Sequence, residues 1–141
     1  MRLLFCVFLS ITLLARLCHA QTDNGPRAAY VEFGGSTIFY SVNGEVPIAP
    51  ARTVRVGAMV LPQLFGVTTS IHQLLGTGDH RVVLGLGVAL MGGPGDNFAR
   101  GTATIGYRVT RRGSFFQIAS TPFITKRGVH RYAGVSFGKS F

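Results

Sequence analysis

Cysteine and acidic residues are scarce in this chain, and tryptophan is absent. Both cysteines, Cys6 and Cys18, lie within the first twenty residues. Without those residues the chain has no thiol, which excludes disulfides, cysteine metal ligands and a cysteine nucleophile. The histidines are scattered and have no metal-ligand spacing, so the sequence predicts no metal site and no cofactor.

The first twenty residues have the features of a secretory signal. Arg2 supplies a positive start, an apolar stretch follows over 3–15, and Cys18-His19-Ala20 resembles a cleavage site. The apolar stretch is too short to span a bilayer comfortably. We therefore expect an exported protein with a signal peptide at 1–20, a linker at 21–27 and one domain at 28–141.

The charge balance is strongly basic. Five acidic residues stand against 14 lysines and arginines, and the net charge of +9 falls to +7 when Arg2 and Arg16 leave with the signal. A basic domain of this kind often binds nucleic acid. Export argues against that partner, and the anionic lipid of an outer membrane is the more accessible one.

Short runs of alternating residues follow the signal, and no long helix is predicted. In the run 82–90, large apolar residues at even positions alternate with Val83, Gly85, Gly87 and Ala89. In the run 102–110, Ala103, Ile105, Tyr107 and Val109 alternate with polar or small residues. The sequence therefore predicts an all-β fold whose strands have one large apolar face and one small or polar face.

Seven runs carry this pattern clearly, at 38–43, 54–60, 67–75, 82–90, 102–110, 114–124 and 133–141. The run 38–43 places Ile38, Tyr40 and Val42 opposite Phe39, Ser41 and Asn43. Pro122 within the sixth run fits only at a strand end, a bulge or an edge.

These faces predict a small antiparallel transmembrane β-barrel of about eight strands, because such a barrel presents apolar side chains to lipid and polar or small ones to its lumen. Counting back from Phe141 places external connections near 126–130, 91–100 and 61–66, and periplasmic ones near 111–113, 76–79 and 47–51. Residues 91–100 are expected to be the longest loop. An eighth strand at 28–33, followed by a Gly34-Gly35-Ser36 turn, brings both chain ends to the periplasmic side. The alternative is one long bulged strand over 30–46, which does not.

The order of several motifs resembles that of small outer-membrane β-barrel proteins of Bacteroidetes-type bacteria, most of which have no assigned molecular function. The similar segments are 34–43, 72–76, 104–108, 115–116 with 121–123, and 133–138. The resemblance implies insertion by barrel-assembly machinery, with Phe141, Phe137 and Val135 as its terminal signal. Lys139 departs from that pattern, since an aromatic or apolar residue usually precedes the last one by two positions.

Glu45, Arg55 and Arg108 fall on inward faces and are predicted to form an ion-pair network that fills the lumen. The alternative is a pore or an anion site. Ser70 and His72 share a strand face, as in a barrel-embedded lipid acyl hydrolase, but no local carboxylate is placed to orient the imidazole, so we predict no catalysis. His80 and His130 are expected in turns.

The external connections carry Arg100, Lys126, Arg127 and Arg131, which are predicted to contact lipopolysaccharide phosphates or simply to be solvated. Tyr40, Tyr107, Tyr132, Phe116 and Phe123 are expected to form aromatic girdles. The leading functional hypothesis is an outer-membrane barrel with a structural or interaction role. The alternative is a soluble secreted or periplasmic β-barrel or sandwich that binds a small apolar ligand with its larger apolar residues turned inward.

Overall fold

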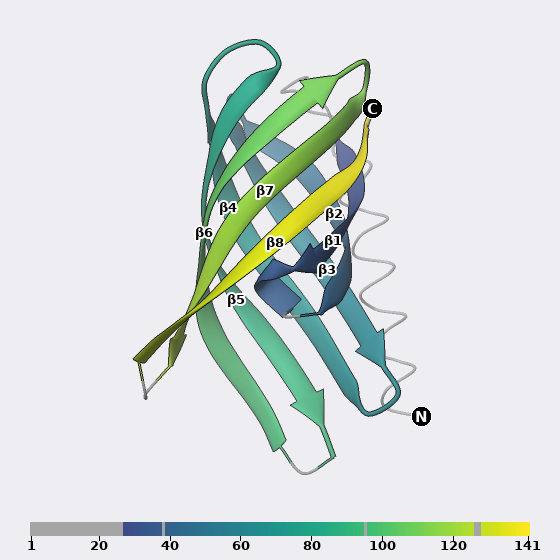
Figure 1. Cartoon of the computed structure of the whole chain (residues 1–141), viewed down its shortest axis with the longest axis vertical. Helices are drawn as coiled ribbons and strands as arrows, with labels where there is room; N and C mark the ends of the chain where they lie inside the picture. Colours follow the sequence, from purple (N-terminus) through teal and green to yellow (C-terminus); the bar gives the residue numbers. More distant parts are fainter. Residues whose placement is uncertain (1–26, 38, 95, 126–127) are drawn as a thin grey trace.

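A computed structural model describes residues 27–37, 39–94, 96–125 and 128–141. Its eight strands form one closed antiparallel barrel in which every strand pairs with its neighbours in the sequence and β1 pairs with β8 (Figure 1). The all-β class and the eight-stranded barrel are therefore confirmed. The signal peptide predicted at 1–20 and residues 21–26 of the linker lie outside the described residues.

The strands are β1 (Ala28–Gly34), β2 (Tyr40–Ala49), β3 (Arg52–Leu61), β4 (Leu64–Leu75), β5 (His80–Gly93), β6 (Asp96–Arg111), β7 (Ser114–Thr125) and β8 (Gly128–Ser140), with a 3₁₀ turn, η1 (Gly35–Thr37), between β1 and β2. The strand predicted at 28–33 is present. With seven residues it is shorter than the roughly 9–11 residues of a spanning strand.

Alternation places the strand faces as the sequence predicts. Leu86, Val60 and Ile105 are 72%, 70% and 61% exposed on the outer wall, whereas Arg55, Glu45 and Asn43 are buried inside. The sequence placed Phe39 on the same strand face as Ser41 and Asn43, and this is wrong, because Phe39 lies in the connection between η1 and β2 and is exposed. Within the described residues, no helix has the length and hydropathy needed to cross a membrane.

The connections are shorter than expected. The residues predicted as the longest loop, 91–100, mostly belong to β5 and β6, which pair as far as Gly93 and Asp96. Likewise, most of 61–66, 47–51 and 128–130 belongs to strands, and so do His80 and His130. Glycines and a proline at 91–100 predicted a loop, but most of these residues pair across the β5–β6 hairpin, and this pairing satisfies their backbone groups.

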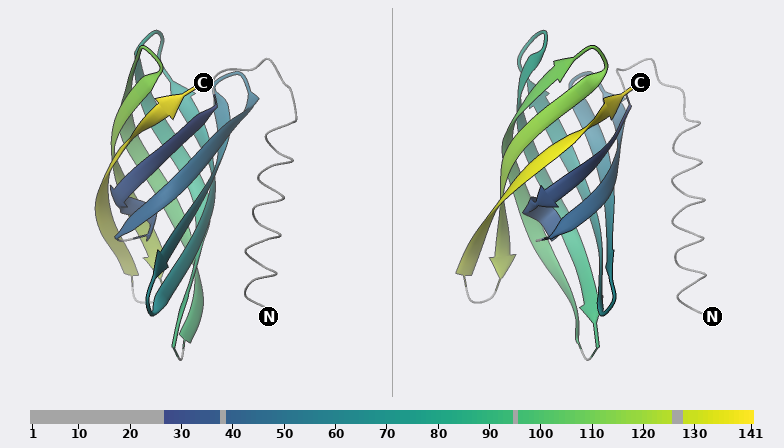
Figure 2. Two further views of the ribbon diagram at one scale, coloured as in Figure 1. Left: turned by 90° about the vertical axis from the view of Figure 1, so that its right-hand side faces the viewer. Right: turned by 45° about the vertical axis from the view of Figure 1, so that its right-hand side comes forward.

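All three connections predicted on the periplasmic side lie at the end of the barrel that carries Arg27 and Phe141, here called the Phe141 end. The β6–β7 connection is a two-residue turn in which both Arg112 and Gly113 have positive φ. This conformation suits the twist of a hairpin. The β3–β4, β5–β6 and β7–β8 connections lie at the opposite end (Figure 2).

The β1–β2 connection folds into the barrel. Gly34 and Gly35 have φ values of +73° and +68°, which only glycine adopts without strain, and they turn the chain inward. Gly35, Ser36 and Thr37 are all buried, and η1 packs against β4, β7 and β8 as well as β2. The predicted Gly34-Gly35-Ser36 turn is therefore also part of the packed interior of the barrel.

Pro122 lies within β7, in register with Arg131 of β8. The register between β6 and β7 has no partners at Ala103 and Thr104, opposite Thr121 and Pro122. Proline has no N–H to donate, so the ladder is interrupted on one side of β7 and continues on the other. A closed barrel can thus hold a proline away from any edge.

Candidate functional site in the barrel lumen

The lumen gathers its charged side chains from strands far apart in the sequence. Glu32 comes from β1, Glu45 from β2, Arg55 from β3 and Arg108 from β6, and each is at most 6% exposed. Each side chain is inward because it occupies the small or polar face of its strand. Together they make two carboxylates and two guanidinium groups in one enclosed volume.

The first layer, nearer the Phe141 end, is built on Glu45 and Arg108. Arg108 donates Nη1 to Oε1 of Glu45 at 2.9 Å and Nη2 to Oε2 at 2.7 Å, a bidentate pair. Its Nε donates to Oε1 of Gln117 at 2.9 Å, and the Thr53 hydroxyl donates to Glu45 at 2.8 Å. The Phe115 ring lies 4.5 Å from the guanidinium carbon. The pair is thus fixed in position and direction.

The second layer lies nearer the opposite end and centres on Arg55. Its Nη2 is paired with Oε2 of Glu32 and donates to the Ser36 hydroxyl at 2.8 Å, while its Nε donates to Oδ1 of Asn43 at 2.9 Å. The Ser36 N–H in turn lies 3.4 Å from Oε1 of Glu32. Because Ser36 belongs to η1, this ion pair ties the inward-folded connection to the barrel wall.

Two aromatic rings fill the space beside these layers. Tyr30 and Phe115 meet edge to face with centroids 5.0 Å apart, and Arg55 lies 5.5 Å from the centroid of Tyr30. Both rings are buried. Gly138 of β8 lies in register with both residues, which lets the rings meet across the strand that separates them.

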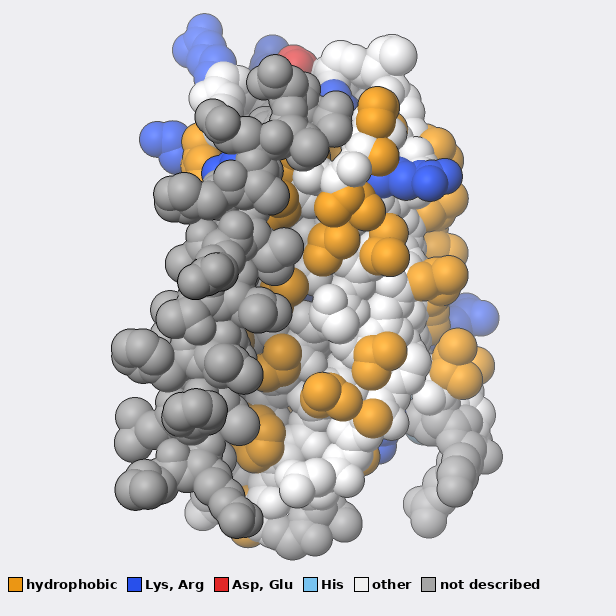
Figure 3. Space-filling view, turned by 180° about the vertical axis from the view of Figure 1, so that it is seen from behind, with side chains coloured by type: hydrophobic (Ala, Val, Ile, Leu, Met, Phe, Trp, Pro, Cys, Tyr) orange, Lys and Arg blue, Asp and Glu red, His pale blue; other side chains and the backbone are white. Residues whose placement is uncertain are grey.

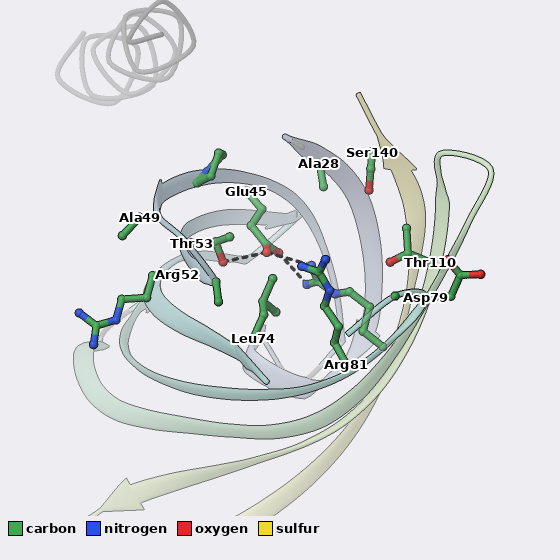
Figure 4. A pocket seen from close by; sticks show the side chains of 14 residues that line it. Ala28, Glu45, Ala49, Arg52, Thr53, Leu74, Asp79, Arg81, Thr110 and Ser140 are labelled. Carbon is green, nitrogen blue, oxygen red and sulfur yellow. Dashed lines mark hydrogen bonds and ion pairs between the residues drawn. The ribbon is translucent and has the colours of Figure 1, made fainter. Parts of the chain in front are cut away.

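The two ion-paired layers are charge neutral, and their four charged side chains are buried in the lumen. Each buried carboxylate has a buried guanidinium partner, as the cost of burying a lone charge requires. A cavity of about 320 Å³ opens at the Phe141 end, with Glu45, Thr53, Asp79 and Arg81 in its lining. Figure 4 shows Glu45 and Arg81 pointing into it, whereas Arg52 points away.

All three predicted lumen charges are inside the barrel. Their ion pairs, however, do not join residues that are neighbours in the sheet register. Glu45 and Arg55 are register partners on β2 and β3, yet Glu45 pairs with Arg108 and Arg55 with Glu32. Glu32 was missed as a lumen residue. Glu32 lies on the same strand face as Ala28 and Tyr30, and this pattern identifies it as an inward residue. The pattern was hard to see because the strand is short.

Ser70 and His72 do meet, with Oγ and Nε2 3.0 Å apart. His72 is fully buried, and its Nδ1 has no hydrogen-bond partner among the described residues. A serine nucleophile needs a base that a third group orients. Among the described residues no hydrogen bond from a third group orients the His72 ring.

Two of the four residues predicted to contact lipopolysaccharide lie in described strands. Arg100 is in β6, with its guanidinium carbon 4.3 Å from the centroid of Phe98, and Arg131 is exposed in β8. Lys126 and Arg127 lie outside the described residues.

The terminal-signal residues Val135, Phe137 and Phe141 are all exposed on the outer wall. Among the predicted girdle residues, Tyr40, Tyr107 and Phe116 are also exposed outward. Phe123 is fully buried and Tyr132 packs against it at 5.3 Å, so their assignment to the girdle is wrong. At the end opposite Phe141 the lumen becomes apolar, and these two rings fill it with Ala89, Met91 and Phe98.

Among the described residues, no three histidine, cysteine or acidic side chains gather as metal ligands. No family model, no curated protein and no solved structure matches this chain. The resemblance to Bacteroidetes-type barrels therefore stays a prediction, while the eight-stranded fold that it implied is present.

Proposed function

We propose that the protein is an outer-membrane β-barrel of a Gram-negative cell envelope, with a structural or interaction role and no catalytic activity. One observation carries the proposal: burial is inverted relative to a water-soluble protein. Charged and polar side chains such as Arg55, Glu32 and Gln117 are at most 2% exposed, while large apolar side chains cover the outer wall. In water such a wall would be an aggregation hazard, and in a bilayer it is the favoured surface.

The alternative, a soluble secreted barrel, requires the two faces of each strand to be exchanged. A soluble barrel that binds an apolar ligand turns its large apolar residues inward and leaves a cavity among them. Here Leu84, Leu86 and Leu90 point outward, and Glu45 and Arg108 line the cavity at the Phe141 end. The inverted burial supports the membrane barrel over this alternative.

A partner follows from the basic residues at the end opposite Phe141. In an outer membrane with the Phe141 end toward the periplasm, the exposed Arg131 and the half-buried Arg100 face the outer leaflet. We propose that they contact lipopolysaccharide phosphates through charge-assisted hydrogen bonds. Arg100→Gln combined with Arg131→Gln is then expected to reduce the lipopolysaccharide retained on the purified barrel.

Membrane fractionation with gel mobility tests the central proposal. We expect the protein in the detergent-extracted outer-membrane fraction, with unheated and heated samples migrating differently because a closed barrel resists unfolding by detergent. Recovery in the soluble fraction, without a heat-dependent band, would refute a membrane barrel and favour the secreted alternative.

A further inference from the structure

Basic side chains gather on the outer wall at the Phe141 end. Arg111 ends β6, Lys139 lies next to the last residue of β8, and both are exposed. On β6, Arg111 is on the same outward face as Tyr107. On β8, Lys139 is on the same outward face as Phe137. Figure 3 shows the face of the barrel opposite β7 and β8, and there too most of the visible lysine and arginine side chains lie toward this end, above a wall of apolar side chains.

The sheet register brings Arg111 and Lys139 to the two sides of one small polar residue. Ser114 of β7 pairs with Arg111 on one side and with Lys139 on the other. The next position across the seam is Ala29 of β1, which pairs with Lys139. With strands about 4.8 Å apart, the Cα atoms of Arg111 and Lys139 are about 10 Å apart. Two long basic side chains can therefore reach one group that lies above the Ser114 hydroxyl.

Neither Arg111 nor Lys139 forms an ion pair with another described residue. The two ion pairs of the described residues are both in the lumen. Arg112 in the adjoining turn and Arg27 before β1 add further positive charge. The acidic side chains described near this end are Asp79, in the β4–β5 connection, and Glu45, which is paired with Arg108 in the lumen.

The next row toward the middle of the barrel is apolar on the same four strands. Two residues along, Val109, Phe116, Phe137 and Val31 follow one another across β6, β7, β8 and β1 in register. Phe33 stacks on Phe137 with centroids 5.8 Å apart. A rise of about 3.4 Å per residue separates the two rows by about 7 Å. The side chains on the outer wall thus change from basic to aromatic over the distance that separates the phosphate of a phospholipid from its acyl chains.

We propose that Arg111, Ser114 and Lys139 bind the phosphate of an anionic phospholipid, whose acyl chains lie along Phe116 and Phe137. The inference rests on the proposed membrane location, which places the Phe141 end in the periplasmic leaflet, where phospholipid and not lipopolysaccharide is the anionic lipid. It also gives Lys139 a role. The residue that departs from the apolar terminal pattern is the cation of a lipid site.

Native mass spectrometry of the folded barrel in detergent tests this site, with phosphatidylglycerol and phosphatidylcholine of the same acyl chains as probes. We expect tighter binding of phosphatidylglycerol by the unmodified protein. Arg111→Gln combined with Lys139→Gln should weaken that binding about five-fold for each charge removed and leave phosphatidylcholine binding unchanged. Arg111→Lys combined with Lys139→Arg should retain it.

Arg52→Gln is the matched control for Lys139→Gln alone, since it removes the same charge from an exposed position on β3, away from the proposed site. Equal weakening by these two single variants would mean that only net charge matters and would overturn the site. Equal binding of the two lipids by the unmodified protein would overturn it as well. Each variant is first shown to give the heat-dependent band, so loss of the barrel itself is seen separately from loss of the lipid.

Discussion

At the scale of single residues, the Glu45–Arg108 pair is the contact whose loss should cost most. Arg108→Ala leaves the Glu45 carboxylate buried without its bidentate partner. We expect a loss of about 3–5 kcal/mol in the free energy of unfolding, measured by urea titration in lipid vesicles. Arg131→Ala, at an exposed position, should change that free energy by less than about 0.5 kcal/mol.

The double variant Glu45→Leu with Arg108→Met tests whether the two side chains stabilise each other, because it leaves neither charge buried without a partner. Since both charges leave together, its destabilisation should be clearly smaller than the sum of the two single losses. Additive effects would show that the two side chains are stabilised independently.

Inward glycines are a second residue-scale feature, because they make room for large side chains on neighbouring strands. A Cβ at Gly138 would overlap the Ala29 carbonyl oxygen and Tyr30 Cβ, whereas one at Gly101 would meet no atom within 4 Å. We expect Gly138→Ala to destabilise the barrel by about 1–3 kcal/mol through overpacking. Gly101→Ala is the matched control and should be nearly neutral. Similar unfolding midpoints for the two variants would contradict the packing around Tyr30.

At the scale of strands, the closing seam between β1 and β8 extends past the last residue of β8. Arg27 and Phe141 exchange two backbone hydrogen bonds of 2.9 Å. Deleting Phe141 removes both bonds and an exposed aromatic side chain from the membrane-facing row. We expect slower assembly into the membrane with normal export, measured as processed but unfolded protein in the periplasm. Normal insertion of the shortened chain would count against this role.

Strand existence and facing were predictable from sequence, and strand length was not. Alternation along 82–90 and 102–110 identified β5 and β6 and their outward faces, because a period of two is a local property. The same sequence placed 91–100 in a loop, because Gly92, Gly93 and Pro94 are local signals for a turn. Pairing between β5 and β6 as far as Gly93 and Asp96 overrides those signals.

At the scale of the whole molecule, the filled lumen determines permeability. The two ion-paired layers, the Tyr30 and Phe115 rings and the inward-folded η1 occupy the interior of a barrel with only eight strands. We expect no stepwise ion conductance in planar bilayers. The control is a sample of the same vesicles that shows the heat-dependent band, and a steady single-channel current from it would contradict a closed lumen.

The sequence alone determined which face of each strand is apolar, that the chain is all-β with about eight strands, and that Glu45, Arg55 and Arg108 point inward. These are consequences of alternation, which each strand carries by itself. Only the tertiary structure decided that Arg108 pairs with Glu45 and Arg55 with Glu32, that η1 folds inward, and that Arg111 and Lys139 flank Ser114. These depend on the register between strands and on closure of the barrel, which join residues far apart in the chain.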